Sequence, residues 1–436
     1  MSPVSACVIG AGSSGITALK ALLDKEINAD CFEQTEHIGG LWAFGSSSSA
    51  AYRTLHINSY RREMSYADFP MPETFSDFPH HSEILRYFND YVDHFGLRSH
   101  IQLGTAVEHI EPLSESGFEV RLTGGDRRHY DAVLVANGHH AVPRWPEPAP
   151  PGRFEGHQMH SHDYREMAEL AGHRVVVVGM GNSAMDIAVE SSYVADRTYL
   201  STRRGAYVIP KHLFGYARLP IPIGDRRLPW RVRQFLLQQT VRLAVGRPER
   251  YGLPAPAHKI LQTHPTVSDT LLSRLSHGAI IPKPSITELC GRTVRFSDSS
   301  VVEADVIVYC TGYRITFPFL DTEVMAATDN RLPLYIRVFP PELARLSFIG
   351  FIQPWGSIMP IAEAQSKLVA DQICGDYALP DLTTMRRAIA RQDEQLARRY
   401  VASRRHTIQV DAPVYLHELA VEHAAGRRRA RQLARL

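Results

Sequence analysis

The sequence predicts an α/β fold with two Rossmann-like dinucleotide-binding domains, because one strand–turn–helix pattern occurs twice along the chain. Residues 4–9 form a short β-type run before the glycine-rich segment GAGSSG at 10–15, and a helical pattern of apolar residues follows. Residues 174–178 form a second apolar run before GMGNSA at 179–184, again with a helical pattern after it. The chain therefore contains two βαβ units.

The remaining patterns place these two units within the chain. A later strand is expected at 305–309, and two long helices at 383–400 and 413–432 form a helical C-terminal segment. The stretch 45–51 (GSSSSAA) is typical of a mobile loop, and the proline-rich stretch 143–156 suits a stiff linker.

Composition excludes several classes of protein. Of 436 residues, 44% are hydrophobic and 22% are charged, which is ordinary globular composition. The net charge of +2 gives no bulk electrostatic reason to bind nucleic acid or membranes. No apolar run approaches the roughly 20 residues of a membrane-spanning helix, and no secretory signal pattern opens the chain. An arginine-rich stretch, 426–436, is expected to be a solvated helix end or frayed terminus, with a membrane-surface or partner role as the alternative.

The cysteines indicate a cytoplasmic protein with reduced thiols. Their number is five, they are scattered, and no CxxC pair occurs. The histidine pairs likewise lack metal-ligand spacing, so no metal site is assigned. The cysteines are Cys7, Cys31, Cys290, Cys310 and Cys374.

The first glycine-rich turn fits the adenosine half of FAD. Gly10 permits the tight turn, Gly12 lets the backbone approach a pyrophosphate, and Gly15 allows close packing of helix on strand. The next strand, at 30–33, ends in Glu33, close to the expected spacing of about 20 residues after the fingerprint. A carboxylate there accepts hydrogen bonds from ribose hydroxyls and repels a 2′-phosphate.

The second turn fits NADPH. Gly179 and Gly181 are followed by Ala184, an accepted variant of the third position. The strand after this unit ends in Arg203 and Arg204, with no acid at the ribose position. Guanidinium groups hold a 2′-phosphate bidentately, and the sequence leaves open which of the two arginines dominates.

Two dinucleotides on one chain imply that NADPH reduces a flavin, which passes electrons onward. The segment 36–44 (EHIGGLWAF) contains no cysteine, which argues against a flavoprotein disulfide reductase. The cysteine count and spacing exclude an iron–sulfur relay.

The sequence resembles the flavin-containing monooxygenase family, a group of class B flavoprotein monooxygenases. Phe154, Gly156, His160 and Tyr164 match the FxGxxxHxxxY signature of that family. The likeness covers nearly the whole chain and is to soluble, microbial-type members. It continues, in order, through VIGAGSSG, EHIGGLW, INSYRREMSYADFPMP, GMGNSAMDIAVE, CTGYRITFPFL and GSIMPIAEAQ.

The resemblance implies an enzyme that uses NADPH and O2, forms a C4a-hydroperoxyflavin and oxygenates a soft nucleophile, nitrogen or sulfur, of a small molecule. N,N-dimethylaniline monooxygenase activity is the type reaction. The ending Tyr164–Arg165 favours this branch over Baeyer–Villiger oxygenation of ketones, which remains the alternative together with NADPH oxidase or reductase activity. Arg53, Arg61 and Arg62 keep the ketone alternative open. Residues 209–275, whose pattern is unreadable, are expected to form part of the substrate approach.

The resemblance also implies a glutathione-reductase-like arrangement of the two domains. The expected boundaries are 1–165 for the first part of the FAD-binding domain, 166–295 for the NADPH-binding domain, and 296–436 for the second FAD part with the C-terminal helices. A homodimer is the default assembly.

Individual residues take roles from the resemblance. Asn58 is the expected catalytic residue, because an amide can donate and accept near the flavin N5 and the nicotinamide without titrating. His160 is expected to be structural or gating, Tyr164 a cofactor-contact or packing residue, and Cys310 a small residue beneath the nicotinamide. The fingerprints and the resemblance together predict further cofactor contacts at Ser13, Ser14, Gln34, Gly40, Leu41, Trp42, His56, Val107, Asn182, Ser183, Thr311, Gly312 and Gln365.

Overall fold

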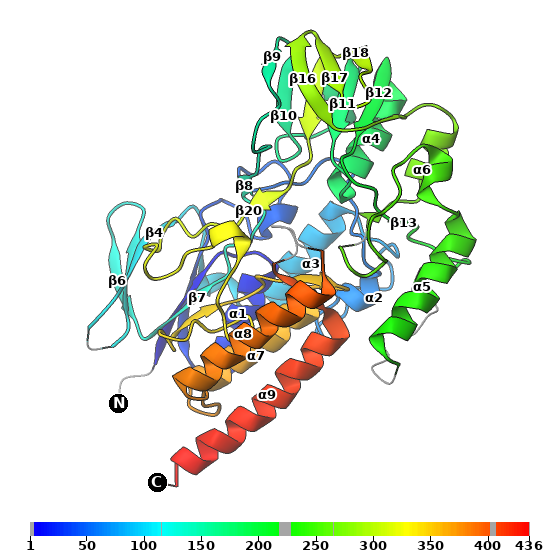
Figure 1. Ribbon diagram of the computed structural model, residues 1–436. Helices are drawn as coiled ribbons and strands as arrows, with labels where there is room; N and C mark the ends of the chain where they lie inside the picture. Colours follow the sequence, from blue (N-terminus) through cyan, green and yellow to red (C-terminus); the bar gives the residue numbers. More distant parts are fainter. Residues whose placement is uncertain (1–3, 115, 218–227, 265, 402–406, 436) are drawn as a thin grey trace. The chain divides into compact units, whose positions relative to one another are not determined.

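The computed structural model describes residues 4–114, 116–217, 228–264, 266–401 and 407–435. The chain forms two compact units (Figure 1). Unit 1 comprises Met1–Ser49, Ser59–Val142 and Arg314–Leu436; unit 2 comprises Ala50–Asn58 and Pro143–Tyr313. Each unit contains a parallel sheet with a glycine-rich turn and a helix, so the α/β prediction is confirmed. The predicted domain boundaries stay predictions.

The described residues of unit 1 form a five-stranded parallel sheet in the order β21-β7-β1-β2-β3. Its central strand, β1, is fully buried at Ala6, Cys7 and Val8, as expected for a strand covered on both faces. Helix α1 (Ser13–Leu23) follows β1 and packs against α7 (Met359–Ile373). The strands are β1 (Ser5–Ile9), β2 (Asn28–Phe32), β3 (Ile101–Gln102), β7 (Ala132–Val135) and β21 (Leu346–Phe348).

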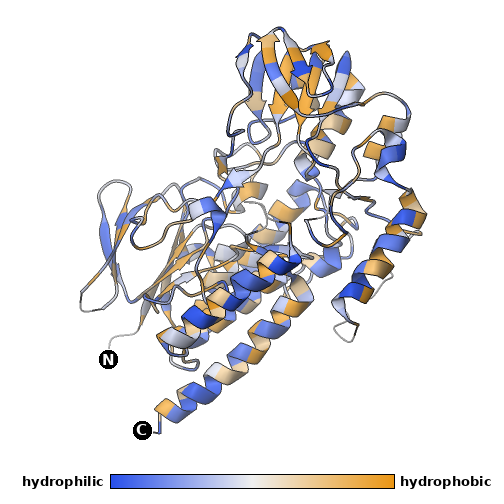
Figure 2. Ribbon diagram, viewed as in Figure 1, coloured by the Kyte–Doolittle hydropathy of each residue, from blue (hydrophilic) through white to orange (hydrophobic). Residues whose placement is uncertain are grey.

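A three-stranded antiparallel sheet and further helices complete unit 1. The two predicted C-terminal helices are confirmed as α8 (Leu382–Arg399) and α9 (Ala412–Leu433). Figure 2 shows that the C-terminal end of α9 is mostly hydrophilic, where Arg427 and Arg428 are exposed. The other elements are β4 (Val107–Pro112), β5 (Phe118–Leu122), β6 (Arg127–Tyr130), β22 (Gln353–Trp355), β23 (Gln409–Asp411), α2 (Arg61–Met64), α3 (His81–His94), η1 (Gly40–Trp42), η2 (Arg98–His100) and η5 (Thr328–Asn330).

Unit 2 is built on a second parallel sheet, in the order β10-β19-β11-β12-β15. Helix α4 (Asn182–Val194) follows β11 and packs against β11 and β12 (Figure 1). The strands are β10 (His157–His160), β11 (Arg174–Val178), β12 (Arg197–Ser201), β15 (Ile281–Lys283) and β19 (Val306–Tyr309).

A smaller sheet in unit 2, in the order β18-β17-β16-β9, uses part of the proline-rich stretch expected as a linker. Strand β9 (Gly152–Phe154) pairs with β16 (Ile286–Gly291). The C-terminal part of the stretch 143–156 is therefore part of a sheet in unit 2 and not a linker. The sheet is completed by β17 (Thr293–Phe296) and β18 (Val301–Glu303), and β8 (Val142–Pro143) pairs with β20 (Tyr313–Arg314) where the chain passes between the units.

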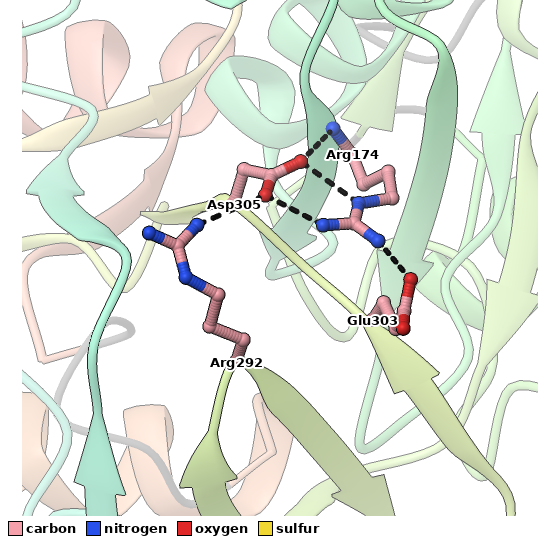
Figure 3. A network of polar contacts seen from close by, with 4 residues as sticks. All are labelled: Arg174, Arg292, Glu303 and Asp305. Atoms are coloured by element: carbon pink, nitrogen blue, oxygen red, sulfur yellow. Dashed lines mark hydrogen bonds and ion pairs between the residues drawn. The ribbon is translucent and has the colours of Figure 1, made fainter.

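An ion-pair network ties the amino ends of β11 and β19 together (Figure 3). The carboxylate of Asp305 accepts hydrogen bonds from Arg174 at backbone N (2.9 Å), Nε (2.8 Å) and Nη2 (2.7 Å). Arg292 Nη1 lies 3.5 Å from the same carboxylate, and Glu303 accepts from Arg174. These bonds hold the pKa of Asp305 well below its usual range. The network lies at the ends of the strands away from the glycine-rich turn and is structural.

The stretch 209–275 contains elements that its sequence pattern did not reveal. Its residues 218–227 and 265 lie outside the described part of the chain. The longest element is an arginine-rich helix, α5 (Trp230–Val245). The others are α6 (Leu271–Ser276), η4 (Pro248–Tyr251), β13 (Val208–Ile209) and β14 (Thr266–Val267), and η3 (Met167–Leu170) precedes β11.

Candidate functional site

The turn between β1 and α1 can be made only by glycine at two of its positions. Gly10 has φ +98°, and a Cβ there would lie 2.9 Å from the carbonyl oxygen of Ala136. A Cβ on Gly15 would lie 1.7 Å from the carbonyl oxygen of Gly10, which is backbone and cannot move aside. The helix therefore starts as close to the strand as the dinucleotide fingerprint requires.

The amino end of α1 is open to an anion. Gly12 is its N-cap residue, and no described side chain caps it. A Cβ on Gly12 would lie 3.7 Å from Cα of Gly40, and Gly39 donates a backbone hydrogen bond to Ala11 (3.0 Å). The structure thus brings the predicted residues Gly12 and Gly40 together. First-turn N–H groups and the helix dipole fit the pyrophosphate of a dinucleotide.

Glu33 lies at the end of β2, as predicted, but its carboxylate is already engaged. It is 5% exposed. Oε2 accepts from backbone N of Ala11 (2.9 Å), and Oε1 accepts from backbone N and Oγ1 of Thr35 (both 2.9 Å). Because an ionised carboxylate offers about four acceptor positions, one position is left for a ribose hydroxyl.

The other predicted FAD residues near this turn lie around it. Ser13 is the first residue of α1, and Ser14 is 9% exposed and packs against Gly350, whose added Cβ would lie 2.1 Å from Ser14 Oγ. Leu41 and Trp42 are partly buried in η1. Gln34 is exposed next to Glu33.

Two predicted contacts lie in the interior of unit 1. Val107, at the start of β4, is 9% exposed and belongs to a hydrophobic core cluster. Gln365, in α7, is fully buried; its Oε1 accepts from backbone N of Gly350 (2.9 Å), and its Nε2 donates to the hydroxyl of Tyr415 (2.8 Å). Its amide therefore holds together the loop after β21 and helix α9, and its role in binding flavin stays a prediction.

The second turn, between β11 and α4, has the same construction with one difference. Gly179 has φ +140°, and its added Cβ would lie 2.7 Å from the carbonyl oxygen of Cys310. Gly181 is the N-cap residue of α4, which is again uncapped by any described side chain. Ala184 fits its methyl group into the core at 0% exposure. The uncapped amino ends of α1 and α4 can each accept an anion, and we call them the first and second anion cradles.

Residues beside the second turn fix the segment opposite it. Asn182 Oδ1 accepts from backbone N of Val267 (2.8 Å), which attaches β14 to the start of α4. Ser183 is partly buried. Burial raises the pKa of the Cys310 thiol to about 12, so this cysteine is a neutral packing group beneath the turn.

Arg203 and Arg204 follow β12, and both are exposed. The loop is held by Thr202, whose backbone N donates to the carbonyl of Lys283 (2.9 Å) and whose Oγ1 donates to the carbonyl of Arg204 (3.1 Å). Within the described residues neither guanidinium forms an ion pair. Both are available to a phosphate.

The signature segment lies wholly in unit 2. His160, in β10, is fully buried, its Nδ1 accepts from backbone N of His162 (3.1 Å), and burial lowers its pKa to about 4. At neutral pH the ring is uncharged, in agreement with a structural role. Tyr164 is fully buried and donates its hydroxyl hydrogen bond to Glu190 of α4.

Thr311 and Gly312 pair with the chain at Arg144. Nη2 of Arg144 donates to the carbonyl of Thr311 (2.9 Å), and its backbone N donates to the carbonyl of Gly312 (2.9 Å). Gly312 has φ +85°, which favours glycine.

The segment Ala50–Asn58 carries the predicted residues His56 and Asn58 into unit 2. His56 is exposed and its Nδ1 lies 2.7 Å from the carbonyl of Thr54. Asn58 is partly buried. Tyr52 and Thr54, with their acceptors on α4, were missed by the sequence interpretation, although those acceptors stand inside the matched segment GMGNSAMDIAVE.

One group of side chains in the described structure has metal-ligand spacing. Ligand atoms of Asp371, Cys374 and Asp376 lie within 4.8 Å of one another. Lys25 Nζ lies 2.6 Å from Asp371 and 2.8 Å from Asp376, so an ammonium group already bridges the two carboxylates. The expectation of no metal stays a prediction.

The two anion cradles, with an acid after one and arginines after the other, are typical of a protein that binds two dinucleotides. Residues 4–427 match the flavin-binding monooxygenase-like family, and the chain belongs to this family. It is 37% identical to flavin-containing monooxygenase 5 of Oryctolagus cuniculus, over 95% of this chain and 81% of that protein. It is 37% identical to dimethylaniline monooxygenase [N-oxide-forming] 2 of Mus musculus, over 96% of this chain and 82% of that protein.

Solved structures agree with this assignment. S-allyl-L-cysteine S-oxygenase from Allium sativum is 26% identical with a TM-score of 0.73, over 96% of this chain and 88% of that chain. An open structure of cyclohexanone monooxygenase has a TM-score of 0.73 at 18% identity, over 98% and 99% of the two chains, and shows the shared fold. The predicted flavin monooxygenase with FAD and NADPH as cofactors is confirmed. Of the helices in the described part of the chain, none combines the length and hydrophobicity needed to span a bilayer.

Proposed function

We propose that this monooxygenase uses NADPH and O2 to oxygenate a nitrogen or sulfur atom of a small molecule. The observation that carries the proposal is the pair of unlike strand ends, Glu33 after one turn and Arg203–Arg204 after the other, in a chain of this family. The substrate class is supported by the names of two similar proteins, one an N-oxide-forming dimethylaniline monooxygenase and the other an S-oxygenase.

The cradle at Gly10–Gly15 fits FAD. Gly12 lies beside Gly40 at the uncapped amino end of α1, and a Cβ there would stand 3.7 Å from Cα of Gly40. We propose that first-turn N–H groups hold the FAD pyrophosphate and that Glu33 accepts from the ribose. Bound FAD supplies the redox centre that takes a hydride from NADPH and delivers activated oxygen to the substrate.

The cradle at Gly179–Ala184 is proposed to hold the NADPH pyrophosphate, with Arg203 and Arg204 on the 2′-phosphate. Guanidinium groups match phosphate geometry through paired N–H donors. Both side chains are exposed, so NADPH can enter and leave without unpacking the core.

Asn58 is proposed as the catalytic residue. Its amide donates and accepts hydrogen bonds at any working pH, which suits a group that orients the nicotinamide and flavin without gaining or losing a proton. His160 is assigned no proton transfer, because burial lowers its pKa to about 4 and the ring is neutral at physiological pH.

The test is oxygen-isotope incorporation. Purified protein with FAD, NADPH and labelled O2 is incubated with a panel of tertiary amines, sulfides and cyclic ketones, and products are analysed by mass spectrometry. One labelled oxygen atom in an N-oxide or S-oxide supports the proposal. Esters from the ketones alone would indicate Baeyer–Villiger oxygenation, and hydrogen peroxide alone would indicate an NADPH oxidase. The cytoplasmic location and the homodimer stay predictions.

A further inference from the structure

The segment Ala50–Asn58 is a short arm that leaves unit 1 in sequence and joins unit 2 in space. It ends at Asn58, the proposed catalytic residue. What attaches this arm to unit 2 therefore decides where Asn58 is held.

Two carboxylates of α4 provide the attachment. Asp186 and Glu190 stand one helical turn apart, so both project from the same side of the helix. The Tyr52 hydroxyl donates a hydrogen bond to Asp186, and the Thr54 hydroxyl donates one to Glu190. The second oxygen of Glu190 accepts from Tyr164 of the signature segment. Three hydroxyls thus share two acids.

Most of this set of groups is shielded from solvent. Tyr52 is 5% exposed, Tyr164 0% and Glu190 8%, whereas Thr54 and Asp186 are partly buried. The two tyrosine rings lie 5.9 Å apart, centroid to centroid, within a hydrophobic core cluster. Hydrogen bonds to an ionised acceptor are worth more in such surroundings than at the surface, and an acid that loses its donors there is left poorly solvated.

Backbone bonds add to the attachment. The backbone N of Arg53 donates to the carbonyl of Arg165 (2.8 Å), and its Nε lies 2.5 Å from Glu166. The ion pair is exposed and contributes little. At the far end of the arm, His56 Nδ1 lies 2.7 Å from the carbonyl of Thr54, so the turn that leads to Asn58 starts from an anchored residue.

Helix α4 has a second role, because its first turn is the anion cradle at Gly181. We propose that Asp186 and Glu190 are positioning residues which, through Tyr52 and Thr54, fix the Asn58 arm to the helix that binds the NADPH pyrophosphate. The inference rests on the proposed function. Asn58 is then held in register with the bound nicotinamide by unit 2 itself. Burial raises the pKa of Asp186 to about 6, which is consistent with an acid that depends on its hydroxyl partner.

The test removes one hydroxyl at a time. Thr54→Val and Tyr52→Phe keep side-chain shape and delete one donor each, whereas Thr54→Ser retains the hydroxyl. Tyr130→Phe is the matched control, because Tyr130 is a buried tyrosine of β6 in unit 1 whose hydroxyl donates to Asp30 (2.6 Å). Circular dichroism establishes that each variant is folded.

The first readout is hydrogen–deuterium exchange of the cofactor-free protein, followed by mass spectrometry of peptides that cover residues 50–58. Thr54→Val and Tyr52→Phe are expected to speed exchange in this arm by about tenfold, because each loses a hydrogen bond to a carboxylate. Thr54→Ser is expected to recover most of the protection, and Tyr130→Phe to leave the arm unchanged. Unchanged exchange in both donor-deleting variants would overturn the inference.

The second readout separates positioning from packing. With FAD bound, Thr54→Val is expected to slow flavin reduction by saturating NADPH about tenfold and to raise the peroxide released per NADPH, while the KM for NADPH changes less than about twofold. Faster exchange with an unchanged reduction rate would overturn the positioning role. A wild-type protein that forms no oxygenated product would contradict the proposed function, whereas wild-type oxygenation with unaltered variants would contradict this inference alone.

Discussion

The two dinucleotide turns of this protein share a backbone design and differ in the side chains that surround it. At the third fingerprint position, a Cβ on Gly15 would lie 1.7 Å from a backbone oxygen, whereas the methyl group of Ala184 is accommodated in the core. At the end of the following strand, Glu33 is 5% exposed, whereas Arg203 and Arg204 are exposed. We propose that the turn holds the pyrophosphate and that the strand end selects the dinucleotide.

The difference in burial has a thermodynamic consequence. Glu33 is already fixed by hydrogen bonds from Ala11 and Thr35, so a ribose that binds to it orders no further side chain. Each exposed arginine loses rotamer freedom when it binds a phosphate, at a cost of about 0.5–1.5 kcal/mol per side chain. This contrast suits a resident FAD and an exchanging NADPH.

The largest expected effect comes from Gly15→Ala. The added methyl group forces the start of α1 away from β1, because the obstructing atom is the carbonyl oxygen of Gly10. We expect FAD affinity to fall by more than about a hundredfold. The flavin retained after gel filtration, measured by absorbance, checks this.

The matched change in the second turn is Ala184→Gly. It deletes a buried methyl group near the amino end of α4 and costs about 1 kcal/mol of stability, with FAD content unchanged. If both variants lost FAD equally, the assignment of the first turn to FAD would be wrong.

A smaller effect is expected from the double variant Arg203→Ala with Arg204→Ala. Each hydrogen bond to a phosphate is worth about 1.5–3 kcal/mol, so the KM for NADPH should rise about tenfold to a hundredfold while the KM for NADH stays nearly constant. The two single variants show which arginine dominates. Equal losses with both nucleotides would contradict the 2′-phosphate assignment.

The smallest effect on catalysis is expected at the amino ends of β11 and β19, which lie at the edge of the unit 2 sheet away from the glycine-rich turn. Asp305→Asn weakens the Arg174 network and should lower the free energy of unfolding by about 1–2 kcal/mol, without changing the KM for NADPH. The pKa of Asp305 is lowered in the folded state, so its contribution is present above the usual aspartate pKa and is lost as the pH falls through the lowered value. Chemical denaturation at neutral and strongly acidic pH checks this: the variant and the wild type should converge in acid.

The strands, turns and helices of the two dinucleotide units could be predicted from the sequence, because each depends on residues that are close together in the chain. Strand β11 begins and ends as predicted, and the helices α8 and α9 agree within one residue at each end. Glycine and apolar periodicity are short-range signals, so the strand–turn–helix units are readable without an alignment.

Other features could not be predicted, because they depend on partners far away in the sequence. Tyr52 and Asp186 are 134 residues apart, and Thr54 and Glu190 are 136 residues apart. No local pattern assigns the arm before Asn58 to unit 2. The hydrogen bonds of the Gln365 amide to Gly350 and Tyr415 join residues 15 and 50 positions apart, so no local pattern reveals them. The sequence pattern did not reveal helix α5, because arginines and glutamines interrupt its apolar residues and leave a weak helical period.

We propose that one chain holds FAD at the first turn and accepts NADPH at the second. Anaerobic mixing of the FAD-loaded protein with NADPH or NADH, followed through the visible absorbance of the flavin, tests it most directly. We expect NADPH to bleach the flavin at least about tenfold faster than an equal concentration of NADH does. A protein that stays colourless after incubation with FAD, or a flavin that NADPH does not reduce, would contradict it.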